Sequence, residues 1–339
     1  MSLLIATGCS NKAQTKKVEL LSNPYSRTEF LMGTVVTVKI YDKGKAHVLK
    51  PVFKRIEELA HATTVEDKND RSEIDEVNDQ AGIKPVKVSK DIYRMVKIGK
   101  KYSGRSHGSF DLTIGPLTKL WHIGFSDARK PAQSEIDHVL PLIGYKRMIL
   151  SDQKQTIFLK DKGMRLDLGA IAKGFITDEA VTVLKNYHVQ SAIVDLGGNI
   201  FVMGNNASGE KWTVGIQNPY SPRGEIVGKI KESNQSIVTS GIYERFIKVH
   251  GKIYHHLLNP ADGYPFTNDI AGVSVITDAS TDGDALSTVL FAEGVKGGLA
   301  YAKKWGIKAV FVTRDKEVYV TPNLKNKFLL TDKTFNLVK

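Results

Sequence analysis

The order of strand and helix patterns along the chain constrains its fold more than any other feature of the sequence. The stretch Phe30 to Tyr41 is rich in β-branched residues and predicts a strand, and Lys50 to Ala62 predicts an amphipathic helix. A second amphipathic helix is expected from Ser89 to Ser103, with Ser89 as its N-cap. Because later strands and helices follow one another without a regular βαβ rhythm, the pattern favours an α+β fold over a doubly wound sheet.

The second half of the chain continues this mixture. Phe158 to Asp167 predicts a strand that breaks at a glycine and continues as a helix from Ala170 to Tyr187. Ser191 to Asp195 and Asn199 to Met203 predict a hairpin with a Gly-Gly turn. Together the elements predict one large domain over residues 28–339, with room for two subdomains. Further strands are expected at Trp212 to Gln217, Ile237 to Ser240, Ile253 to Leu258, Ala271 to Ile276, Ala309 to Thr313 and Val318 to Val320, and helices at Asp282 to Glu293 and Gly297 to Trp305.

The first residues indicate a lipid anchor. Leu3 to Ile5 are apolar, the next three residues are small, and Cys9 precedes a polar run that contains lysines. This pattern is similar to the end of a bacterial lipoprotein signal, although a complete signal has an apolar stretch of about 7 to 15 residues. We expect residues 1–27 to form a signal remnant, a lipobox at Cys9 and a flexible tether, with the protein lipid-anchored on the extracytoplasmic face of a cell membrane. The alternative is a plain thiol on a disordered tail.

The charge and cysteine content exclude several classes of function. The net charge of +12 comes from 48 Lys and Arg against 36 Asp and Glu, and it is scattered along the chain. No basic run is interleaved with aromatic residues, so no nucleic acid is expected as a partner. One cysteine provides neither a disulfide framework nor a cysteine-based zinc site. No later segment approaches the roughly 18 apolar residues of a membrane span.

Thr281 to Thr288 is the strongest candidate for a metal site. If a helix begins near Asp282, then Asp284, Ser287 and Thr288 share one face, because they are three and four residues apart. Mg²⁺ prefers such hard oxygens and completes its coordination with water and substrate phosphates. The alternative is helix capping, with Asp282 as the N-cap and Asp284 near the positive end of the helix dipole.

A second candidate is the strand-to-helix turn from Arg165 to Gly174. The start of a helix leaves free backbone N–H groups, which is typical of a phosphate site, and Lys173 in the first turn would add a positive charge. The glycine spacing fits neither the dinucleotide-binding fingerprint nor a P-loop. An ordinary turn that binds nothing is the alternative.

Two further segments carry side chains suited to a site. In Tyr254 to Pro260, the adjacent residues His255 and His256 point to opposite faces of a strand, so at most one of them can face a site and accept a proton. In Gly108 to Pro116, an aromatic residue beside a carboxylate is suited to hold a planar ring. A solvated histidine and a packed turn are the ordinary alternatives.

These segments resemble the ApbE family of FAD:protein FMN transferases by their order in the chain. The resemblance runs from about Phe30 to the last strands, and several motifs in a fixed order are far more specific than any one of them. The motifs are Met32-Gly33-Thr34, Ser72-Glu73 with Asn78, Ser109-Phe110-Asp111 with Gly115-Pro116, Asp167 to Gly174, Asp195 to Asn199, Thr239-Ser240-Gly241 with Tyr243-Glu244-Arg245, His256 to Pro260, and Asp284 to Thr288.

The resemblance implies a site for both a metal ion and FAD. Mg²⁺ would be held by the Ala170 carbonyl, Asp284 and Thr288, with Ser287 where relatives often carry a carboxylate. Lys173 stands where many relatives have an acidic residue. FAD would be contacted at Met32, Ser109, Phe110, Asp111, Asp167, Lys173 and around Leu257.

The implied reaction moves the FMN half of FAD onto a threonine or serine hydroxyl of a partner flavoprotein, with AMP as the leaving group. His256, which aligns with the family histidine, would accept the hydroxyl proton, and Asp284 has an alternative claim to that role. The acceptor would carry a Ser/Thr-Gly-Ala-Ser/Thr motif in a membrane-linked system. Two other functions stay open: a Mg²⁺-dependent FAD pyrophosphatase that releases FMN and AMP, and a non-catalytic flavin-binding lipoprotein.

Overall fold

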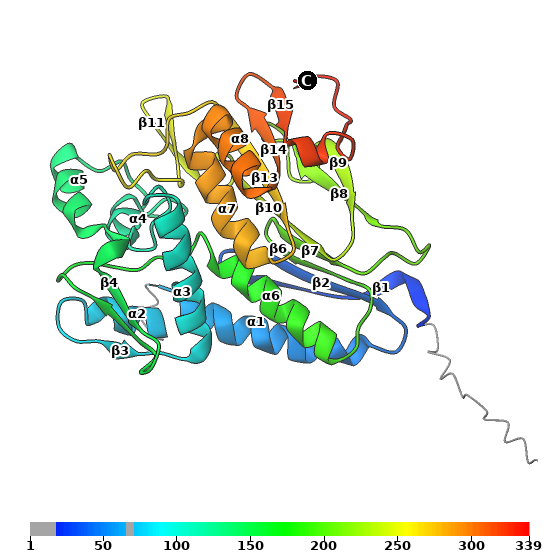
Figure 1. Ribbon diagram of the computed structural model, residues 1–339, viewed down its shortest axis with the longest axis horizontal. Helices are drawn as coiled ribbons and strands as arrows, with labels where there is room; N and C mark the ends of the chain where they lie inside the picture. The colour runs from blue at the N-terminus through cyan, green and yellow to red at the C-terminus, as the bar shows by residue number, and fades with distance from the viewer. Residues whose placement is uncertain (1–17, 66–70, 339) are drawn as a thin grey trace, which may run out of the picture.

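A nine-stranded sheet runs through the molecule, and helices cover one of its faces (Figure 1). The structure is a computed structural model that describes residues 18–65 and 71–338. Neighbouring strands of the sheet pair antiparallel except the last two. In spatial order the strands are β1 (Leu20–Leu31), β2 (Thr34–Asp42), β6 (Ala192–Leu196), β7 (Asn199–Met203), β10 (Gln235–Gly241), β13 (Ile270–Thr277), β14 (Lys308–Thr313), β15 (Glu317–Val320) and β17 (Asn336–Leu337).

The main hydrophobic core lies between this sheet and four helices. Alternate residues of β2, Val36, Val38 and Ile40, are fully buried on the core face. They belong to the same cluster as Phe53 and Phe291, which are carried by two of the helices. Full burial of a side chain of this size contributes about 1.5–3 kcal/mol, so this layer holds the sheet and helices together. The helices are α1 (Leu49–Thr63), α6 (Ala172–Asn186), α7 (Ser280–Ala292) and α8 (Gly294–Trp305).

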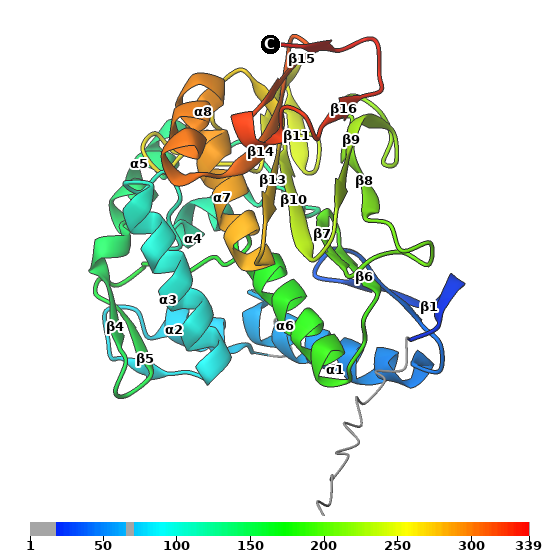
Figure 2. The same cartoon turned by 45° about the vertical axis from the view of Figure 1, so that its right-hand side comes forward.

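A smaller sheet packs on the opposite face of the large sheet, against β7, β10, β13, β14 and β15 (Figure 2). Its strands are β16 (Leu329–Leu330), β9 (Ile226–Glu232) and β8 (Trp212–Gln217). Val227 of β9 packs in one cluster with Ile237 of β10. The sequence analysis did not predict β9, because a glycine and charged residues dilute its apolar pattern.

The remaining elements form a layer beside α6 and α7 (Figure 1). Within it, Trp121 is fully buried, donates its Nε1–H to the Gly263 carbonyl at 2.8 Å and packs against Tyr254. This contact fixes the segment that carries His256 to a neighbouring helix. The elements are α2 (Glu73–Asp79), β3 (Val86–Lys87), α3 (Lys90–Arg105), α4 (Gly115–Trp121), α5 (Gln133–Val139), β4 (Met148–Ser151), β5 (Thr156–Leu159), β11 (Phe246–Val249) and β12 (Lys252–His255), and the short 3₁₀ helices of the whole chain are η1 (Ala46–Val48), η2 (Leu140–Leu142), η3 (Tyr145–Arg147) and η4 (Pro322–Leu324).

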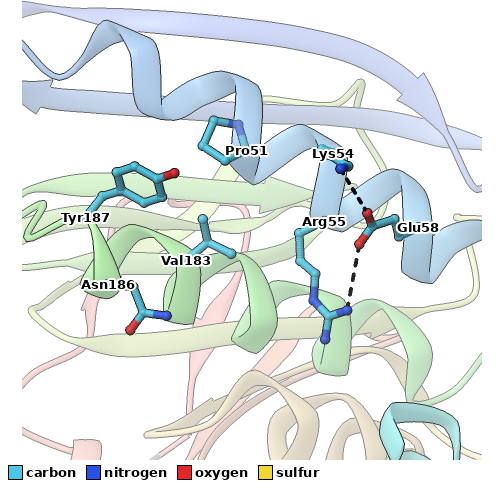
Figure 3. Close-up of a pocket in the computed structure, with 7 residues that line it drawn as sticks. All are labelled: Pro51, Lys54, Arg55, Glu58, Val183, Asn186 and Tyr187. Carbon is cyan, nitrogen blue, oxygen red and sulfur yellow. Dashed lines mark ion pairs between the residues drawn. The ribbon is translucent and has the colours of Figure 1, made fainter. Parts of the chain in front are cut away.

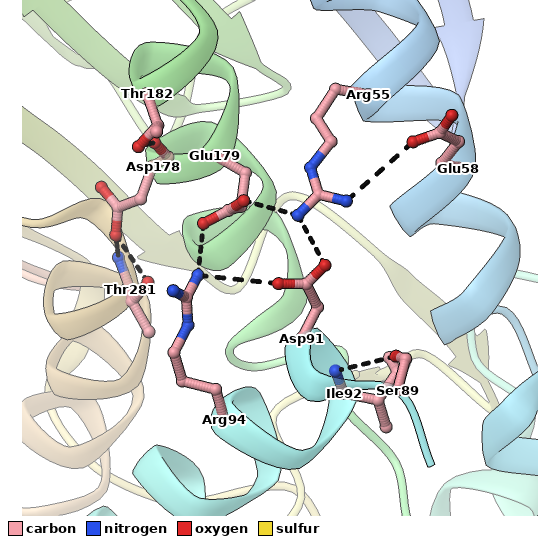
Figure 4. Close-up of polar contacts among 10 residues, drawn as sticks. All are labelled: Arg55, Glu58, Ser89, Asp91, Ile92, Arg94, Asp178, Glu179, Thr182 and Thr281. Atoms are coloured by element: carbon pink, nitrogen blue, oxygen red, sulfur yellow. Dashed lines mark hydrogen bonds and ion pairs between the residues drawn. The ribbon is translucent and has the colours of Figure 1, made fainter. Parts of the chain in front are cut away.

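Polar contacts lock α6 to its neighbours (Figure 4). The Asp178 carboxylate of α6 accepts hydrogen bonds from Ser280 N at 2.7 Å, Thr281 N at 2.9 Å and Thr281 Oγ1 at 2.6 Å. It therefore caps the first turn of α7 from a different helix. On the other side of α6, Glu179 pairs with Arg55 of α1 at 2.5 Å. These contacts fix where α7 begins relative to α6.

The α+β fold is confirmed, with corrections at some element boundaries. The helix α7 begins at Ser280 with Ala279 as its N-cap, so the alternative that made Asp282 the N-cap is wrong. The strand β5 ends at Leu159, because Asp161 to Gly163 bend the chain before it reaches α6. In the described ranges, no helix is long and apolar enough to span a membrane.

The segment Leu20 to Arg27, which the sequence pattern assigned to the flexible tether, belongs to β1 and pairs with β2. The register of the pair shifts between Leu20 and Tyr25, around Asn23-Pro24. Proline is tolerated there because β1 is an edge strand and the irregularity removes the need for a ladder hydrogen bond. The predicted lipobox at Cys9 lies outside the described residues.

Candidate active site

The candidate metal residue Asp284 lies where α7 meets the first turn of α6. Its side chain is buried, and its Oδ2 accepts a hydrogen bond from Gly174 N at 2.8 Å. The Lys173 ammonium is 3.6 Å from Oδ1, which is an ion pair longer than a normal hydrogen bond. Two segments that the sequence singled out separately therefore form one site.

The other two predicted metal residues on α7 differ in their surroundings. Ser287 is fully buried, and its Oγ donates to the Asp284 carbonyl at 2.8 Å and pairs with Ser240 Oγ at 2.7 Å. Thr288 is partly exposed, one helical turn after Asp284. Asp284 and Thr288 therefore share a helix face, whereas the Ser287 hydroxyl is already committed to protein partners.

The turn before α6 offers fewer free N–H groups than the sequence suggested. Gly169 N donates to Asp167 Oδ1 at 2.7 Å, Ala172 N donates to the Leu168 carbonyl at 2.8 Å, and Gly174 N donates to Asp284. The prediction of a phosphate site made from these backbone groups is wrong for these three positions, because protein acceptors already use them. The positive charge at this turn comes from the Lys173 side chain, which is partly exposed, as are Ala170 and Asp167.

The segment from Ser109 to Asp111 turns two of its side chains inward. Phe110 is 2% exposed and packs edge-on against Tyr102 in the main core. The Asp111 carboxylate accepts from Thr113 N at 2.8 Å, Thr113 Oγ1 at 2.7 Å and Tyr145 N at 2.8 Å, and burial raises its pKa. These two side chains therefore hold the protein together, so the prediction that they hold a planar ring is not supported, and contact with FAD through the backbone stays a prediction.

The Met32-Gly33 turn joins β1 to β2. Both residues have positive φ, 53° and 69°, which is the geometry of the two-residue hairpin turn that matches the strand twist. Met32 is partly buried against the main core. Gly33 faces the end of the Arg245 side chain, because a Cβ added at Gly33 would lie 3.3 Å from Arg245 Nη2. The predicted FAD contact Met32 therefore lies beside a positively charged side chain.

The two adjacent histidines have different environments. His255 is buried, its Nε2 donates to the Phe266 carbonyl at 3.1 Å, and burial lowers its pKa to about 4. His256 is partly exposed, and both its backbone N (3.1 Å) and its Nδ1 (3.2 Å) face the Arg245 carbonyl. A carbonyl can only accept, so Nδ1 carries the proton and Nε2 of the neutral ring is free to accept one.

Desolvation of its ring is the main reason that the pKa of His256 is lowered to about 3, and the positive charges of Arg245 and Lys173 add to the shift. The charges of Lys173 and Arg245 therefore disfavour the protonated imidazole. His256 is therefore neutral at physiological pH. Leu257, the neighbouring predicted FAD contact, is buried in the main core.

The chemistry of the oxygens around Asp284 fits Mg²⁺. The described part of the chain holds no cluster of three or more His, Cys, Asp or Glu that could bind a metal ion. One buried carboxylate with the Thr288 hydroxyl one helical turn later instead suits an ion that takes one or two carboxylates and completes its shell with water and phosphate. The buried carboxylate also needs a counter-charge, and Lys173 supplies it only loosely at 3.6 Å.

A separate hollow between α1 and α6 contains none of the predicted site residues (Figure 3). It is lined at its α6 side by Val183, Asn186 and Tyr187, at the opposite end of that helix from Lys173. The site is therefore not this hollow.

The residues described above lie in the part of the chain that matches a known protein family. The profile of the ApbE family matches residues 32–311, a range that includes every predicted site residue. This chain belongs to the ApbE family. The resemblance predicted from the order of the motifs is confirmed.

Relatives of this ApbE family member cover almost its whole length. An FAD:protein FMN transferase from Klebsiella pneumoniae is 35% identical over 317 residues, which cover 93% of this chain and 97% of that protein. A protein of the same name from Treponema pallidum is 32% identical over 347 residues, covering 97% of this chain and 93% of that protein. The predicted enzyme class, a transferase, is confirmed.

Solved ApbE structures share the fold. The ApbE protein from Thermotoga maritima superposes with a TM-score of 0.83 at 25% identity, covering 90% of this chain and 99% of that one. The flavinyl transferase ApbE from Pseudomonas stutzeri superposes with a TM-score of 0.78 at 25% identity, covering 90% and 97%. Both results support a single α+β domain.

Three residues that the sequence analysis quoted only as motif members contact the site in this ApbE chain. Gly174 donates to Asp284, Ser240 pairs with Ser287, and Arg245 holds His256. Their motif positions were a signal, but each contact joins segments far apart in sequence.

The first prediction concerns the contact between α6 and α7. A Cβ at Gly174 would lie 2.4 Å from the Ser280 carbonyl oxygen and 2.8 Å from Asp284 Cβ. We expect Gly174→Ala to destabilise the protein by about 1–3 kcal/mol through overpacking, although alanine favours a helix by about 1 kcal/mol over glycine. Urea unfolding followed by circular dichroism measures this.

Gly104→Ala is the matched control. Gly104 lies in another helix, α3, and a Cβ there would meet only Tyr145 Cε2, at 3.8 Å. We expect it to be neutral or stabilising. Equal behaviour of the two variants would show that α6 and α7 are not in close contact at Gly174.

Proposed function

We propose that this ApbE family member is a Mg²⁺-dependent transferase that moves the FMN moiety of FAD onto a threonine or serine hydroxyl of a target flavoprotein and releases AMP. The observation that carries the proposal is the pairing of Asp284 with Lys173 at the start of α6, at 3.6 Å, together with the effect of the Lys173 charge on His256. A carboxylate for a metal, a cation for phosphate and a neutral base are the groups that this reaction needs. The names of the relatives support FAD as the substrate.

The metal would be held by the Asp284 carboxylate, the Thr288 hydroxyl and the Ala170 carbonyl. When bound, Mg²⁺ polarises the phosphorus–oxygen bond that breaks and offsets the charge on the departing phosphate. Ser287, which the sequence placed among the metal residues, contributes instead by holding the Asp284 carbonyl and Ser240.

The protein residues act on charge and on one proton. The acceptor oxygen forms a bond to the FMN-side phosphorus, the bond from that phosphorus to the AMP oxygen breaks, and the hydroxyl proton passes to His256 Nε2. Lys173 offsets the negative charge that develops on the phosphate. Asp284 is the weaker candidate for the base, because its carboxylate is buried and engaged with Gly174 and Lys173.

FAD would lie against the turns that surround this group of residues. Met32 lies in the β1–β2 turn beside Arg245, Asp167 lies in the turn before α6, and the backbone of Ser109 to Asp111 connects to that turn because Asp167 N donates to the Leu112 carbonyl at 2.9 Å. Leu257, beside His256, would contact the flavin through its main chain because its side chain is buried.

The acceptor would present its hydroxyl in a Ser/Thr-Gly-Ala-Ser/Thr motif, and we propose that it is membrane-linked. A lipid on Cys9 would hold this enzyme on the same extracytoplasmic membrane face and raise the effective concentration of the pair. Cys9 lies outside the described residues.

The second prediction tests the reaction. The purified chain with FAD, Mg²⁺ and a small protein carrying the motif should increase the acceptor mass by one FMN, measured by intact mass spectrometry. We expect EDTA to abolish the reaction and Asp284→Ala to slow it by about a hundredfold or more, because the metal loses its carboxylate.

Asp315→Ala, which removes an exposed carboxylate from the β14–β15 turn, is the control and should leave the rate unchanged. Free FMN and AMP with an unmodified acceptor would instead indicate the pyrophosphatase. Unchanged FAD would indicate a flavin-binding lipoprotein.

The third prediction concerns pH. In the folded enzyme the His256 pKa is about 3, against 6.5 for an ordinary histidine, so its ring stays neutral as pH falls through 6.5. We expect the single-turnover rate of FMN transfer to change by less than about twofold between pH 7.5 and pH 5.

Below pH 6.5 the unfolded chain takes up a proton that folded His256 does not, so the same shift lowers the free energy of unfolding as pH falls. Circular dichroism at each pH therefore accompanies the rates. A loss of rate with a midpoint near 6.5 in protein that remains folded would rule out a depressed pKa for the base.

The fourth prediction concerns the metal-free site. Lys173 is the counter-charge of Asp284, so a cation that binds Asp284 competes with it. We expect Lys173→Met to bind Mg²⁺ alone more tightly, on the order of fivefold, and FAD more weakly. Isothermal titration calorimetry measures both affinities.

Lys185→Met removes the same charge from the exposed last turn of the same helix and is the matched control. If Lys173→Met and Lys185→Met shift the Mg²⁺ affinity equally, Lys173 has no specific role as counter-charge.

A further inference from the structure

Arg245 is attached to the proposed base by two hydrogen bonds. It directly precedes β11, and its carbonyl accepts from both the backbone N and the Nδ1 of His256, at 3.1 and 3.2 Å. Any movement of the Arg245 backbone therefore moves the imidazole. The position of this arginine relative to the reacting proton is set by the fold.

Two glycines make room for the Arg245 side chain. A Cβ at Gly124 would lie 2.8 Å from Arg245 Cδ, and a Cβ at Gly33 would lie 3.3 Å from Arg245 Nη2. Both glycines have positive φ, 107° and 69°. The side chain thus passes from the Gly124 loop to the Met32-Gly33 turn, which places the guanidinium beside a residue expected to contact FAD.

Within residues 18–65 and 71–338, no carboxylate pairs with the guanidinium of Arg245. Among the hydrogen bonds and ion pairs that join described residues, none involves this group. The adjacent carboxylate, Glu244, is taken by Arg223 at 2.7 Å. Arg245 is exposed, so a ligand can reach it. An accessible, uncompensated guanidinium whose charge acts on His256 together with that of Lys173 is suited to an anion.

We propose that Arg245 is a substrate-binding residue of this transferase and that its guanidinium binds the pyrophosphate of FAD. The proposal rests on the proposed function, since it names the group that holds the phosphates near His256. The planar fork of an arginine binds two phosphate oxygens at once, whereas Lys173 provides a single point of charge. The two cations together orient the phosphorus toward the acceptor hydroxyl and offset the charge that develops there.

A structural role for the Arg245 stem makes a different prediction. If the side chain only fills the space between Gly33 and Gly124, methionine retains most of the packing and loses nothing else. If the guanidinium binds phosphate, Arg245→Met weakens the binding of only those ligands that carry phosphate, and Arg245→Lys keeps part of the affinity for them.

The test compares two flavins. Flavin fluorescence gives the dissociation constants of FAD and of riboflavin for the full chain, with EDTA present to prevent turnover. For Arg245→Met we expect the FAD constant to rise on the order of tenfold and the riboflavin constant to change by less than about twofold, because one charged hydrogen-bonding group to phosphate is lost. With Mg²⁺ and acceptor, the KM for FAD should rise more than kcat falls.

Arg314→Met is the matched control. Arg314 is an exposed arginine whose charge lowers the pKa of the other histidine, His255, so its loss has a similar general electrostatic effect. The proposal is overturned if the dissociation constant of FAD is unchanged in Arg245→Met, or if the dissociation constants of FAD and riboflavin rise equally. It is also overturned if Arg314→Met raises the dissociation constant of FAD to the same extent. If the unsubstituted protein binds FAD and transfers FMN, and Arg245→Met does so equally well, only the role of Arg245 is contradicted. If the unsubstituted protein neither binds FAD nor transfers FMN, the proposed function is contradicted as well.

Discussion

The hydrogen bond from Gly174 N to the Asp284 carboxylate is the contact on which the site depends. It joins the first turn of α6 to α7, and it forms only because Gly174 has no Cβ to strike Ser280. Asp178 strengthens the same junction one turn later by capping α7. With the two helices fixed in this way, the Lys173 ammonium can reach Asp284. Ala170 lies two residues before α6 begins.

The charges of Asp284, Lys173 and Arg245 influence one another and the protonation of His256. A buried carboxylate requires a positive partner, and Lys173 and Arg245 make the surroundings of His256 positive. Desolvation of the ring is the main cause of the lowered His256 pKa, and these two positive charges add to the shift and would favour a phosphate-bearing ligand. In the proposed reaction, these charges would therefore help both to keep the base neutral and to bind an anionic substrate.

The sequence predicted the parts of this fold that depend on local pattern. Helices such as α3, with Ser89 as its N-cap, follow from apolar spacing and capping residues. Asp284, Lys173 and His256 were found as candidates because each lies in a short segment with recognisable chemistry. The sequence could not predict that Gly174 contacts Asp284, because 110 residues separate them.

Burial was the other quantity that the sequence did not determine. Phe110 and Asp111 have side chains suited to a flavin, yet packing and three hydrogen bonds turn them inward. With Lys173 and Ser287 at these two positions, the site pairs one carboxylate with one ammonium and is close to neutral without a metal. In the proposed function, a Mg²⁺ ion would gain little from the protein alone and would need the oxygens of the pyrophosphate, so metal and FAD would each favour the binding of the other.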